Sequence, residues 1–367
     1  MGTLLRMETE PIRYGIVGLG RAGWAIHVKQ LRERSDAKIV AVVDPLKDRC
    51  EQAAGEFGCK AYPTLAKMLR QGDIEVVVVA TPSVSHGPDA IKAMKAGKHV
   101  VVEKPMAMSV AEADRMIKVS EQTGRKLFVH QNYRFHPEFL HMQEVIRSGI
   151  LGRVFHIRNY IASFARRNDW QTLSRHGGGV LNNTCPHFID QLLQLMGGSI
   201  TRVMGDLQQI ASAGDVEDHV KAFMRSDNGC TADMEISAAE NVASPLPKWI
   251  VCGTHGTLTS DGKTSTIRWI DPSQVPPLEV VDGAAPERKY GNADQLPWQE
   301  KTVPATPAQP SGDFYDNVTA VLRRGEAMRI TPQSVREVIH VIALIRKGTK
   351  FPGKVAKRTA PRAAGAL

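Results

Sequence analysis

The chain has 367 residues, of which 42% are hydrophobic and 23% are charged. These proportions exclude collagen-like, low-complexity and disordered chains, and the length predicts two folded domains. The formal net charge is +9, and seven of the basic residues lie from Arg346 onward, where no acidic residue occurs. We interpret residues 349–367 as a basic, mobile tail and not as a nucleic-acid-binding arm, so no nucleic-acid partner is expected.

Nothing in the sequence predicts a membrane partner. The first eleven residues lack the apolar stretch of a signal peptide, and the run Val76–Ala80 is far too short to span a bilayer. The five cysteines are scattered and form no CxxC pair, which argues against a disulfide framework or a zinc site. We therefore expect a cytoplasmic protein without a bound metal.

Residues 12–130 alternate between short β-branched runs and segments of helix length. This pattern is typical of a parallel sheet with crossover helices, and it predicts a doubly wound α/β domain over residues 12–132. Ser109 and Glu112 have the spacing of a capping box at the start of one helix. Strands are predicted at 12–18, 37–44, 75–82, 98–105 and 126–132, and helices at 24–34, 84–95 and 109–122.

From Gly152 onward the segments are longer, alternate between apolar and polar residues, and have no helices between them. They predict a large, open-faced, mostly antiparallel sheet in an α+β domain over residues 133–348. Residues 271–312 are rich in proline and predict a long loop. The strands are predicted at 153–164, 218–226, 229–237, 248–253, 257–262 and 266–270, and helices at 179–196, 312–323 and 332–347.

The strands of this second sheet carry apolar residues such as Trp249, Val251, Ile267 and Trp269 between polar ones. One face of such a sheet packs on a core, and the other face stays uncovered in a single chain. Because an uncovered sheet face of this size usually pairs with another subunit, we expect a homodimer or homotetramer through this sheet.

A glycine-rich turn, GLGRAG, joins the first strand to the first helix. Glycines there permit a tight turn, allow a pyrophosphate to approach the backbone, and bring the helix close to the strand. Asp44 ends the second strand, where a carboxylate accepts hydrogen bonds from the ribose hydroxyls of NAD, although Lys47 or Arg49 could attract the 2′-phosphate of NADP. Arg21 is either a phosphate contact or an exposed residue at the helix start. The candidate cofactor residues of this region are Gly18, Gly20, Arg21, Ala22, Gly23 and Asp44.

Two segments carry the candidate catalytic residues. Lys104, in the motif EKP, follows a strand at the carboxyl edge of the sheet, where open α/β sheets bind ligands; a solvated turn is the alternative interpretation. In GGGVLNNTCPHFID, residues 177–190, the three glycines allow the loop to approach a ligand. Asn183 and His187 are four positions apart and share a face if the segment is helical, with Asp190 one turn further. A histidine there can move a proton at neutral pH, or it can be a structural residue.

With these motifs the chain resembles the glucose-fructose oxidoreductase, inositol dehydrogenase and rhizopine-catabolism (Gfo/Idh/MocA) family over residues 12–348. GLGRAG, ATPSVSHGPDAIKAMKAGKHVVVEKP, NYRFHP, GGGVLNNTCPHFID and CGTHGTL occur in the order of the family. The resemblance implies an N-terminal Rossmann domain, an open-faced sheet domain that often mediates oligomerisation, and hydride exchange between a nicotinamide cofactor and a sugar, polyol or related alcohol. It places Lys104 and His187 on the family's catalytic positions, Thr81, Pro82, His86 and Glu103 in the cofactor pocket, and Tyr133 and Arg134 on the loop that enters the substrate site.

The chain departs from the family pattern at Asn183, where an aspartate is usual. An aspartate can stabilise an imidazolium, whereas an amide can orient His187 by hydrogen bonding alone, so the departure shifts weight to Lys104 as the acid or base. A cation such as Arg134 could lower the pKa of Lys104. Near this segment Trp170 lies among basic residues, Arg166, Arg167, Arg175 and His176, and it stacks on a sugar ring or belongs to a solvated loop.

The sequence thus predicts an NAD-dependent oxidoreductase, with NADP as a second choice of cofactor, that acts on a secondary alcohol of a sugar, sugar acid or polyol. Two alternatives stay open. One is a glycoside hydrolase that uses bound NAD for a transient oxidation, and the other is a nucleotide-binding sensor without enzymatic activity. The presence of both Lys104 and His187 argues against a sensor.

Overall fold

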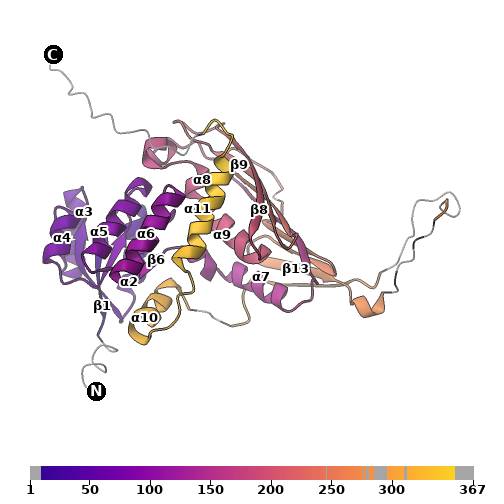
Figure 1. Ribbon diagram of the computed structural model, residues 1–367, viewed down its shortest axis with the longest axis horizontal. Coiled ribbons are helices and arrows are strands. Elements are labelled where there is room, and N and C mark those ends of the chain that lie inside the picture. The colour runs from indigo at the N-terminus through magenta and orange to yellow at the C-terminus, as the bar shows by residue number, and fades with distance from the viewer. Residues whose placement is uncertain are drawn as a thin grey trace, which may run out of the picture.

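A computed structural model describes residues 10–351, apart from 245, 276, 278, 279, 281, 285–295, 310 and 311. Most of the predicted basic tail therefore lies outside the described residues. Two sheets dominate the molecule, a parallel one near the N-terminus and a larger one formed by the second half of the chain, and helices lie between them (Figure 1). Within the described residues, no helix has both the length and the apolar character that crossing a bilayer requires.

The N-terminal sheet is parallel throughout and has the strand order β3-β2-β1-β4-β5-β6. Its central strand β4 consists of four valines that are fully buried, because helices cover both faces of the sheet. The order reverses between β1 and β4, so the crevice for a ligand lies at the carboxyl ends of these strands. The strands are β1 (Ile12–Val17), β2 (Ala37–Val43), β3 (Lys60–Ala61), β4 (Val76–Val79), β5 (His99–Val102) and β6 (Leu127–Val129).

The helices of this part differ from the sequence prediction in two details. The first helix begins as a π-helical segment, η1 (Gly23–Val28), before α2 (Lys29–Arg32). At the start of α6, Ser109 accepts a hydrogen bond from the backbone of Glu112, but the Glu112 carboxylate accepts from the backbone of Met108, so the reciprocal half of the predicted capping box is absent. The remaining helices are α3 (Lys47–Phe57), α4 (Leu65–Gln71), α5 (His86–Lys95) and α6 (Val110–Thr123).

The second sheet has eight strands in the order β14-β13-β12-β11-β7-β10-β9-β8, antiparallel except where β7 meets β10. Two of its strands were not predicted, and β14 lies inside the predicted loop 271–312. β14 reads QEKTVP and forms an exposed edge, so it has no apolar alternation to detect. The strands are β7 (Val154–Ala162), β8 (Ile200–Gln208), β9 (His219–Ser226), β10 (Thr231–Ser237), β11 (Trp249–Gly253), β12 (Gly256–Ser260), β13 (Thr264–Trp269) and β14 (Gln299–Pro304).

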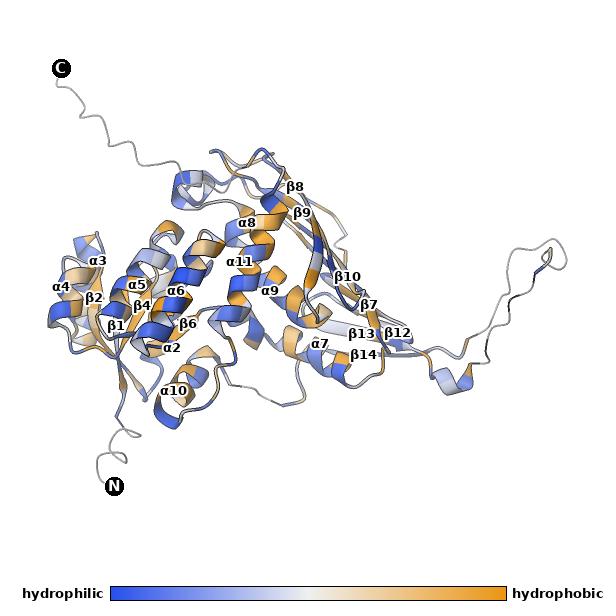
Figure 2. Ribbon diagram, in the orientation of Figure 1, coloured by the Kyte–Doolittle hydropathy of each residue, from blue (hydrophilic) through white to orange (hydrophobic). Residues whose placement is uncertain are grey.

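One face of this sheet packs against helices, and the other is open (Figure 1). The buried face carries apolar residues such as Trp249 and Val251, whereas the open face carries charged pairs such as Lys221 and Glu235, 2.7 Å apart. In Figure 2 these strands alternate between hydrophobic and hydrophilic residues. The helices beside this sheet are α7 (Pro137–Arg147), α8 (Val180–Asn183), α9 (Cys185–Met196) and α11 (Pro332–Arg346).

The last two helices return to the N-terminal part, although they follow the second sheet in the sequence. α11 packs against α6 and β6 as well as against α9 and β8. α10 (Phe314–Arg324) is joined to the N-terminal part by Arg323, whose guanidinium lies 2.9 Å from Glu75, and by the Tyr315 hydroxyl, 2.7 Å from Nδ1 of His27. Figure 1 shows α11 running between the two sheets. The C-terminal helices therefore complete the core beside the parallel sheet.

Candidate active site

The glycine turn after β1 has three glycines with three different surroundings. Gly18 has a φ of +92°, and a Cβ there would lie 2.5 Å from the carbonyl oxygen of Ala80. A Cβ on Gly23 would lie 1.9 Å from the carbonyl oxygen of Gly18, so helix and strand pack too closely for any side chain. At Gly20 the nearest atom to a Cβ is 3.8 Å away, on Arg49. Two glycines therefore shape the turn, and Gly20 leaves open the space that a pyrophosphate needs.

Asp44 lies directly beneath this turn, with 9% of its surface exposed. One carboxylate oxygen accepts the backbone N–H of Leu19 at 2.6 Å, and the other accepts that of Leu46 at 2.9 Å. Arg49 lies 3.6 Å from the same carboxylate. Asp44 thus fixes the glycine turn and leaves its further lone pairs for ribose hydroxyls. Arg21 and Ala22 lie at the start of the following helical segment, and Arg21 is exposed.

The predicted cofactor residues at the end of β4 connect two parts of the site. His86 is buried, and its Nδ1 lies 2.7 Å from the carbonyl oxygen of Pro105 while its Nε2 lies 2.8 Å from that of Thr81. Its imidazole therefore bridges the segment after β4 and the turn that carries Lys104. Pro82 precedes the short turn η2 (Ser83–Ser85), which leads into α5. The backbone carbonyl of Thr81 is thus held by His86, while the Thr81 hydroxyl lies 3.4 Å from the Asp89 carboxylate. Contact of Thr81, Pro82 and His86 with a cofactor stays a prediction.

Glu103 is buried inside the fold, with 5% of its surface exposed. Its Oε1 lies 3.0 Å from Nε2 of His27 and 2.9 Å from Nδ1 of His130, and its Oε2 accepts the backbone N–H of Lys104 at 3.0 Å. Burial alone would raise the pKa of Glu103, but the two imidazoles hold that pKa well below its ordinary value. The carboxylate is therefore a buried anchor for Lys104, and contact of Glu103 with the cofactor stays a prediction.

Sequence reasoning missed both of these histidines. His27 lies on η1 and His130 directly follows β6, and neither forms a motif with Glu103 along the chain. A buried histidine just after a glycine turn is a weak signal by itself. Their ligand atoms and that of Glu103 all lie within 4.8 Å of one another, but the two hydrogen bonds account for this geometry without a metal.

Lys104 leaves the sheet beside the second part of the molecule. Its Nζ donates a hydrogen bond to the backbone carbonyl oxygen of Asn183 at 2.6 Å. Burial lowers the pKa of Lys104, the charge of Arg21 lowers it further, and Glu103 opposes both. The expectation that Arg134 supplies the neighbouring cation is wrong. The guanidinium of Arg134 is paired with Asp190, and Arg21 of the glycine turn takes the role instead.

His187 lies in the first turn of α9, close to Lys104. Burial lowers the pKa of His187 well below its ordinary value, and the charge of Lys104 lowers it further, so the imidazole is neutral at neutral pH. The helix predicted over 179–196 is interrupted at Thr184, between α8 and α9. Asn183 meets Lys104 through its backbone, and Nδ1 of His187 has no hydrogen-bond partner among the described residues. The Asn183 amide therefore does not orient the imidazole through that atom.

Arg134 and Tyr133 lie beside the site on η3 (Asn132–Phe135), but they contact different residues. Two nitrogens of Arg134 lie 2.7 and 2.5 Å from the two carboxylate oxygens of Asp190, and both residues are buried. Burial raises the pKa of Asp190 while Arg134 opposes that change. Arg134 thus holds η3 against α9. The ring of Tyr133 stacks on that of His187, with 3.9 Å between the ring centres.

The three glycines before α8 pack closely against other parts of the protein. A Cβ on Gly177 would meet the side chains of Met108 and Ser83, one on Gly178 would lie 2.2 Å from the carbonyl oxygen of Gln171, and one on Gly179 would lie 2.2 Å from Glu217. The Glu217 carboxylate also accepts the backbone N–H of Leu181 at 3.0 Å. The glycines therefore allow the segment to pack tightly against its neighbours, and the approach of a ligand to this loop stays a prediction.

Trp170 lies on η4 (Trp170–Thr172), and 42% of its surface is exposed. Its ring meets that of His176 edge-on, 6.5 Å between centres. In the same basic segment, Arg167 donates to Asp169 and Gln171, which fixes that guanidinium locally. Trp170 is thus partly exposed, and among the described residues no hydrogen bond or ring contact joins it to Lys104 or His187, so its contact with a substrate stays a prediction.

The chain matches known families over most of its length. Residues 12–131 match an oxidoreductase family with an NAD-binding Rossmann fold, and residues 139–259 match the Gfo/Idh/MocA C-terminal domain. The scyllo-inositol 2-dehydrogenase (NAD(+)) of Bacillus subtilis (strain 168) is 30% identical over 256 residues, which cover 67% of this chain and 73% of that protein. The myo-inositol 2-dehydrogenase of Thermotoga maritima is 30% identical over 212 residues, 56% of this chain and 63% of that protein.

Solved structures agree with this assignment. The crystal structure of an NAD-binding protein from Listeria innocua has a TM-score of 0.77 and 28% identity, and the match covers 91% of this chain and 93% of that one. That of the WlbA dehydrogenase from Bordetella pertussis, in complex with NADH and UDP-GlcNAcA, shares the fold at 23% identity and a TM-score of 0.72, over 93% and 97% of the two chains. Fold and glycine turn together define an NAD-binding oxidoreductase. The chain belongs to the Gfo/Idh/MocA family, as its motifs predicted.

Proposed function

We propose that the protein is an NAD-dependent dehydrogenase that acts on a secondary alcohol of a sugar, sugar acid or polyol. The observation that supports it best is the hydrogen bond between Lys104 and Asn183, because it brings the lysine at the carboxyl edge of the parallel sheet to the segment that carries His187. The dehydrogenase relatives act on inositols, which are polyols. Five free cysteines accord with the reducing cytoplasm that the sequence predicts.

The cofactor would lie along the glycine turn. Gly20 offers open backbone to the pyrophosphate, the N-terminus of η1 offers N–H groups, and Asp44 offers lone pairs to the adenosine ribose. Bound NAD supplies the hydride acceptor for oxidation of the alcohol. We favour NAD over NADP because the Asp44 carboxylate repels a 2′-phosphate, although Arg49 beside it opposes this effect.

The proton of the alcohol would go to His187 or Lys104. The neutral imidazole of His187 has a lone pair for it, and its depressed pKa favours release of the proton afterwards. Lys104 has a lowered pKa too, and its ammonium can hold the substrate oxygen by a hydrogen bond while the proton leaves. In this assignment Lys104 orients the alcohol and His187 accepts the proton.

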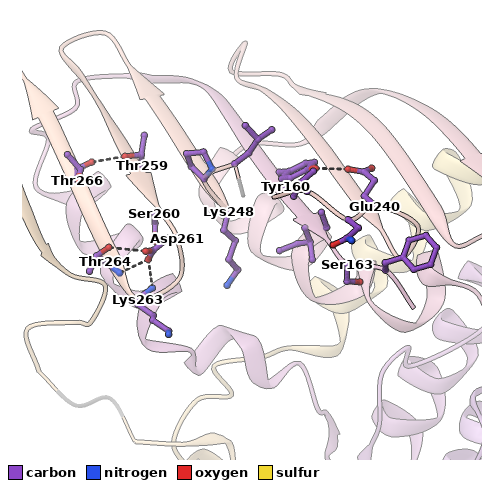
Figure 3. A pocket seen from close by; sticks show the side chains of 17 residues that line it. Tyr160, Ser163, Glu240, Lys248, Thr259, Ser260, Asp261, Lys263, Thr264 and Thr266 are labelled. Carbon is purple, nitrogen blue, oxygen red and sulfur yellow. Dashed lines mark hydrogen bonds between the residues drawn. The ribbon is translucent and has the colours of Figure 1, made fainter. Parts of the chain in front are cut away.

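The open sheet face would bind a second subunit. It carries both signs of charge, and exposed apolar residues such as Phe164 and Leu246 rim a pocket beside Tyr160 and Glu240 (Figure 3). A two-fold axis pairs such a mixed surface with itself, which supports a homodimer or homotetramer. Light scattering coupled to gel filtration tests this proposal, and a monomeric mass at all concentrations would refute it.

The activity is tested by titrating nucleotide-stripped protein with NAD and NADP and then screening sugars, uronates and polyols for cofactor reduction. We expect reduction with one alcohol class and a loss of about 10²-fold or more in Lys104→Met, with NAD affinity retained. Tight NAD binding together with product formation and no net reduction would favour the transient-redox hydrolase. Binding without any turnover would favour the sensor.

A further inference from the structure

Three aromatic rings form a stack beside the site. The ring of Tyr133 lies 3.9 Å from that of His187, with 17° between the planes, and 3.9 Å from that of His136 on its other face, with 23° between the planes. Phe188 meets the Tyr133 ring edge-on at 5.9 Å. The tyrosine is therefore clamped between two imidazoles, and its flat face covers that of His187.

The segments that carry these rings are fixed to each other. The Gln131 amide donates to the carbonyl oxygen of Pro186 at 2.8 Å, and the Gln191 amide donates to that of Tyr133 at 2.9 Å. The buried pair of Arg134 and Asp190 adds a third link between η3 and α9. Because these bonds are made by residues in or next to η3, which carries Tyr133, and by residues of α9, which carries His187, they hold the two rings in a fixed relative position.

His187 lacks the usual means of fixing an imidazole. A catalytic histidine is normally oriented by a hydrogen bond at the ring nitrogen that does not react. Nδ1 of His187 is buried without such a partner in the described part of the chain, and Asn183 is engaged through its backbone. The ring contact that the structure does give His187 is the stack on the face of Tyr133.

We propose that Tyr133 is a positioning residue for His187, and that its ring face both sets the imidazole plane and stabilises the imidazolium formed when His187 takes a proton. The face of an aromatic ring is electron-rich and attracts a cation. It would therefore do here what an aspartate does in place of Asn183, without adding a second buried carboxylate. The catalytic half of this proposal rests on the proposed dehydrogenase function, whereas the stacking half does not.

The charged surroundings make such help useful. Burial and neighbouring cations disfavour the imidazolium of His187, and Glu103 opposes them. A polarisable ring face in van der Waals contact offsets part of that cost at short range. The titratable groups that face His187 from the elements around it are Lys104 on the turn after β5, Glu103, His130 after β6, and His136 after η3.

The test is NMR of protein labelled with ¹⁵N-histidine, with the His187 signals assigned by their loss in His187→Gln. We expect the carbon-bound ring protons of His187 to be shifted upfield in the parent and in Tyr133→Phe, and to lose that shift in Tyr133→Leu, which keeps an apolar side chain but has no π face. On acidification from about pH 8 to the lowest pH at which the protein stays folded, the His187 signal should begin to move at a lower pH in Tyr133→Leu than in Tyr133→Phe. The matched control is Tyr62→Leu, which removes another buried tyrosine, in the nucleotide-binding part. It should change neither the ring-proton shifts of His187 nor the pH at which the His187 signal moves.

If the ring-proton shifts of His187 are unchanged in Tyr133→Leu, the stacked arrangement is wrong. If His187 titrates at the same pH in Tyr133→Leu and Tyr133→Phe, the ring of Tyr133 does not stabilise the imidazolium. Once a substrate is known, Tyr133→Leu should lower kcat by about tenfold or more with little change in KM, and Tyr133→Phe should restore it. A KM effect alone would make Tyr133 a substrate contact. Absence of any dehydrogenase activity would refute the proposed function and leave the NMR result on the stack intact.

Discussion

The side chain of Lys104 and the backbone of Asn183 are joined by a hydrogen bond of 2.6 Å across the boundary between the two sheets. The backbone N–H of Lys104 is bound by the Glu103 carboxylate. Asn183 is the last residue of α8, and Thr184 alone separates it from the start of α9. The bond thus couples the position of the lysine to that of the helix carrying His187. A motion that carries Asn183 away from Lys104 would have to break it.

Gly20 and Gly23 should separate cofactor binding from folding. Gly20→Ala meets no atom closer than 3.8 Å, so we expect a melting temperature near that of the parent but NAD binding weakened about tenfold or more. Gly23→Ala would collide with the carbonyl oxygen of Gly18 and should destabilise the fold itself. Thermal unfolding and NAD titration of both variants check this. Normal NAD affinity in Gly20→Ala would place the pyrophosphate elsewhere.

Arg134→Leu should behave as a loss of structure and not as a loss of substrate affinity. It leaves the Asp190 carboxylate buried without its partner, which costs about 3–5 kcal/mol of unfolding free energy. The double variant Arg134→Leu/Asp190→Leu removes both charges and should recover part of that stability. Urea unfolding measures each. A stable single variant with a raised KM would return Arg134 to the substrate site.

Glu103 should make the protein sensitive to acid. Its folded pKa lies below the ordinary value of 4.5, so its stabilising effect is present in full above that value and is lost as the pH falls through the folded pKa. In Glu103→Gln the side-chain NH₂ group would face the backbone N–H of Lys104 at a buried position, so two donors would meet without an acceptor. We expect the free energy of unfolding to fall by about 3 kcal/mol at neutral pH.

The pH profile distinguishes this role from simple packing. The difference in unfolding free energy between the parent and Glu103→Gln should shrink as the pH falls below the ordinary glutamate value. Denaturant unfolding at several pH values measures it. A difference that is constant across that range would mean that the carboxylate charge contributes nothing.

Arg49 should influence the choice of cofactor. Its guanidinium lies 3.6 Å from Asp44, the carboxylate that would face the adenosine ribose of a dinucleotide. Arg49→Leu should leave the NAD dissociation constant within about twofold and weaken NADP binding about tenfold, because the positive charge near a 2′-phosphate is gone. Equal losses for both nucleotides would contradict this assignment.

The sequence was informative where local pattern decides the structure. The run Val76–Val79, within the alternation of β-branched runs and helices, predicted a buried parallel strand, and GLGRAG between a strand and a helix predicted the cofactor turn. The edge strand β14 was not predicted because both of its faces are largely exposed to solvent. The alternation of apolar and polar residues indicates which side chains are buried, and it does not indicate which strands pair.

The environment of the site could not be predicted from spacing. His27, Glu103 and His130 meet from three separate elements, and the bond of Arg134 joins residues 56 positions apart. Spacing suggested that Asn183 orients His187, but Thr184 interrupts the helix between them. Such relationships are set by how the elements pack, which no single segment contains.

The contact of His27 with Tyr315 has a consequence for biosynthesis. The two residues are 288 positions apart, and Tyr315 also meets Tyr14 of β1 edge-on. At ~5–20 residues per second, the ribosome needs roughly 10–40 s to reach α10 after His130 has been made. Throughout that interval the nascent nucleotide-binding sheet lacks the helix that covers its histidines. The dinucleotide-binding half therefore precedes the second sheet in the chain but is completed only after that sheet has been made.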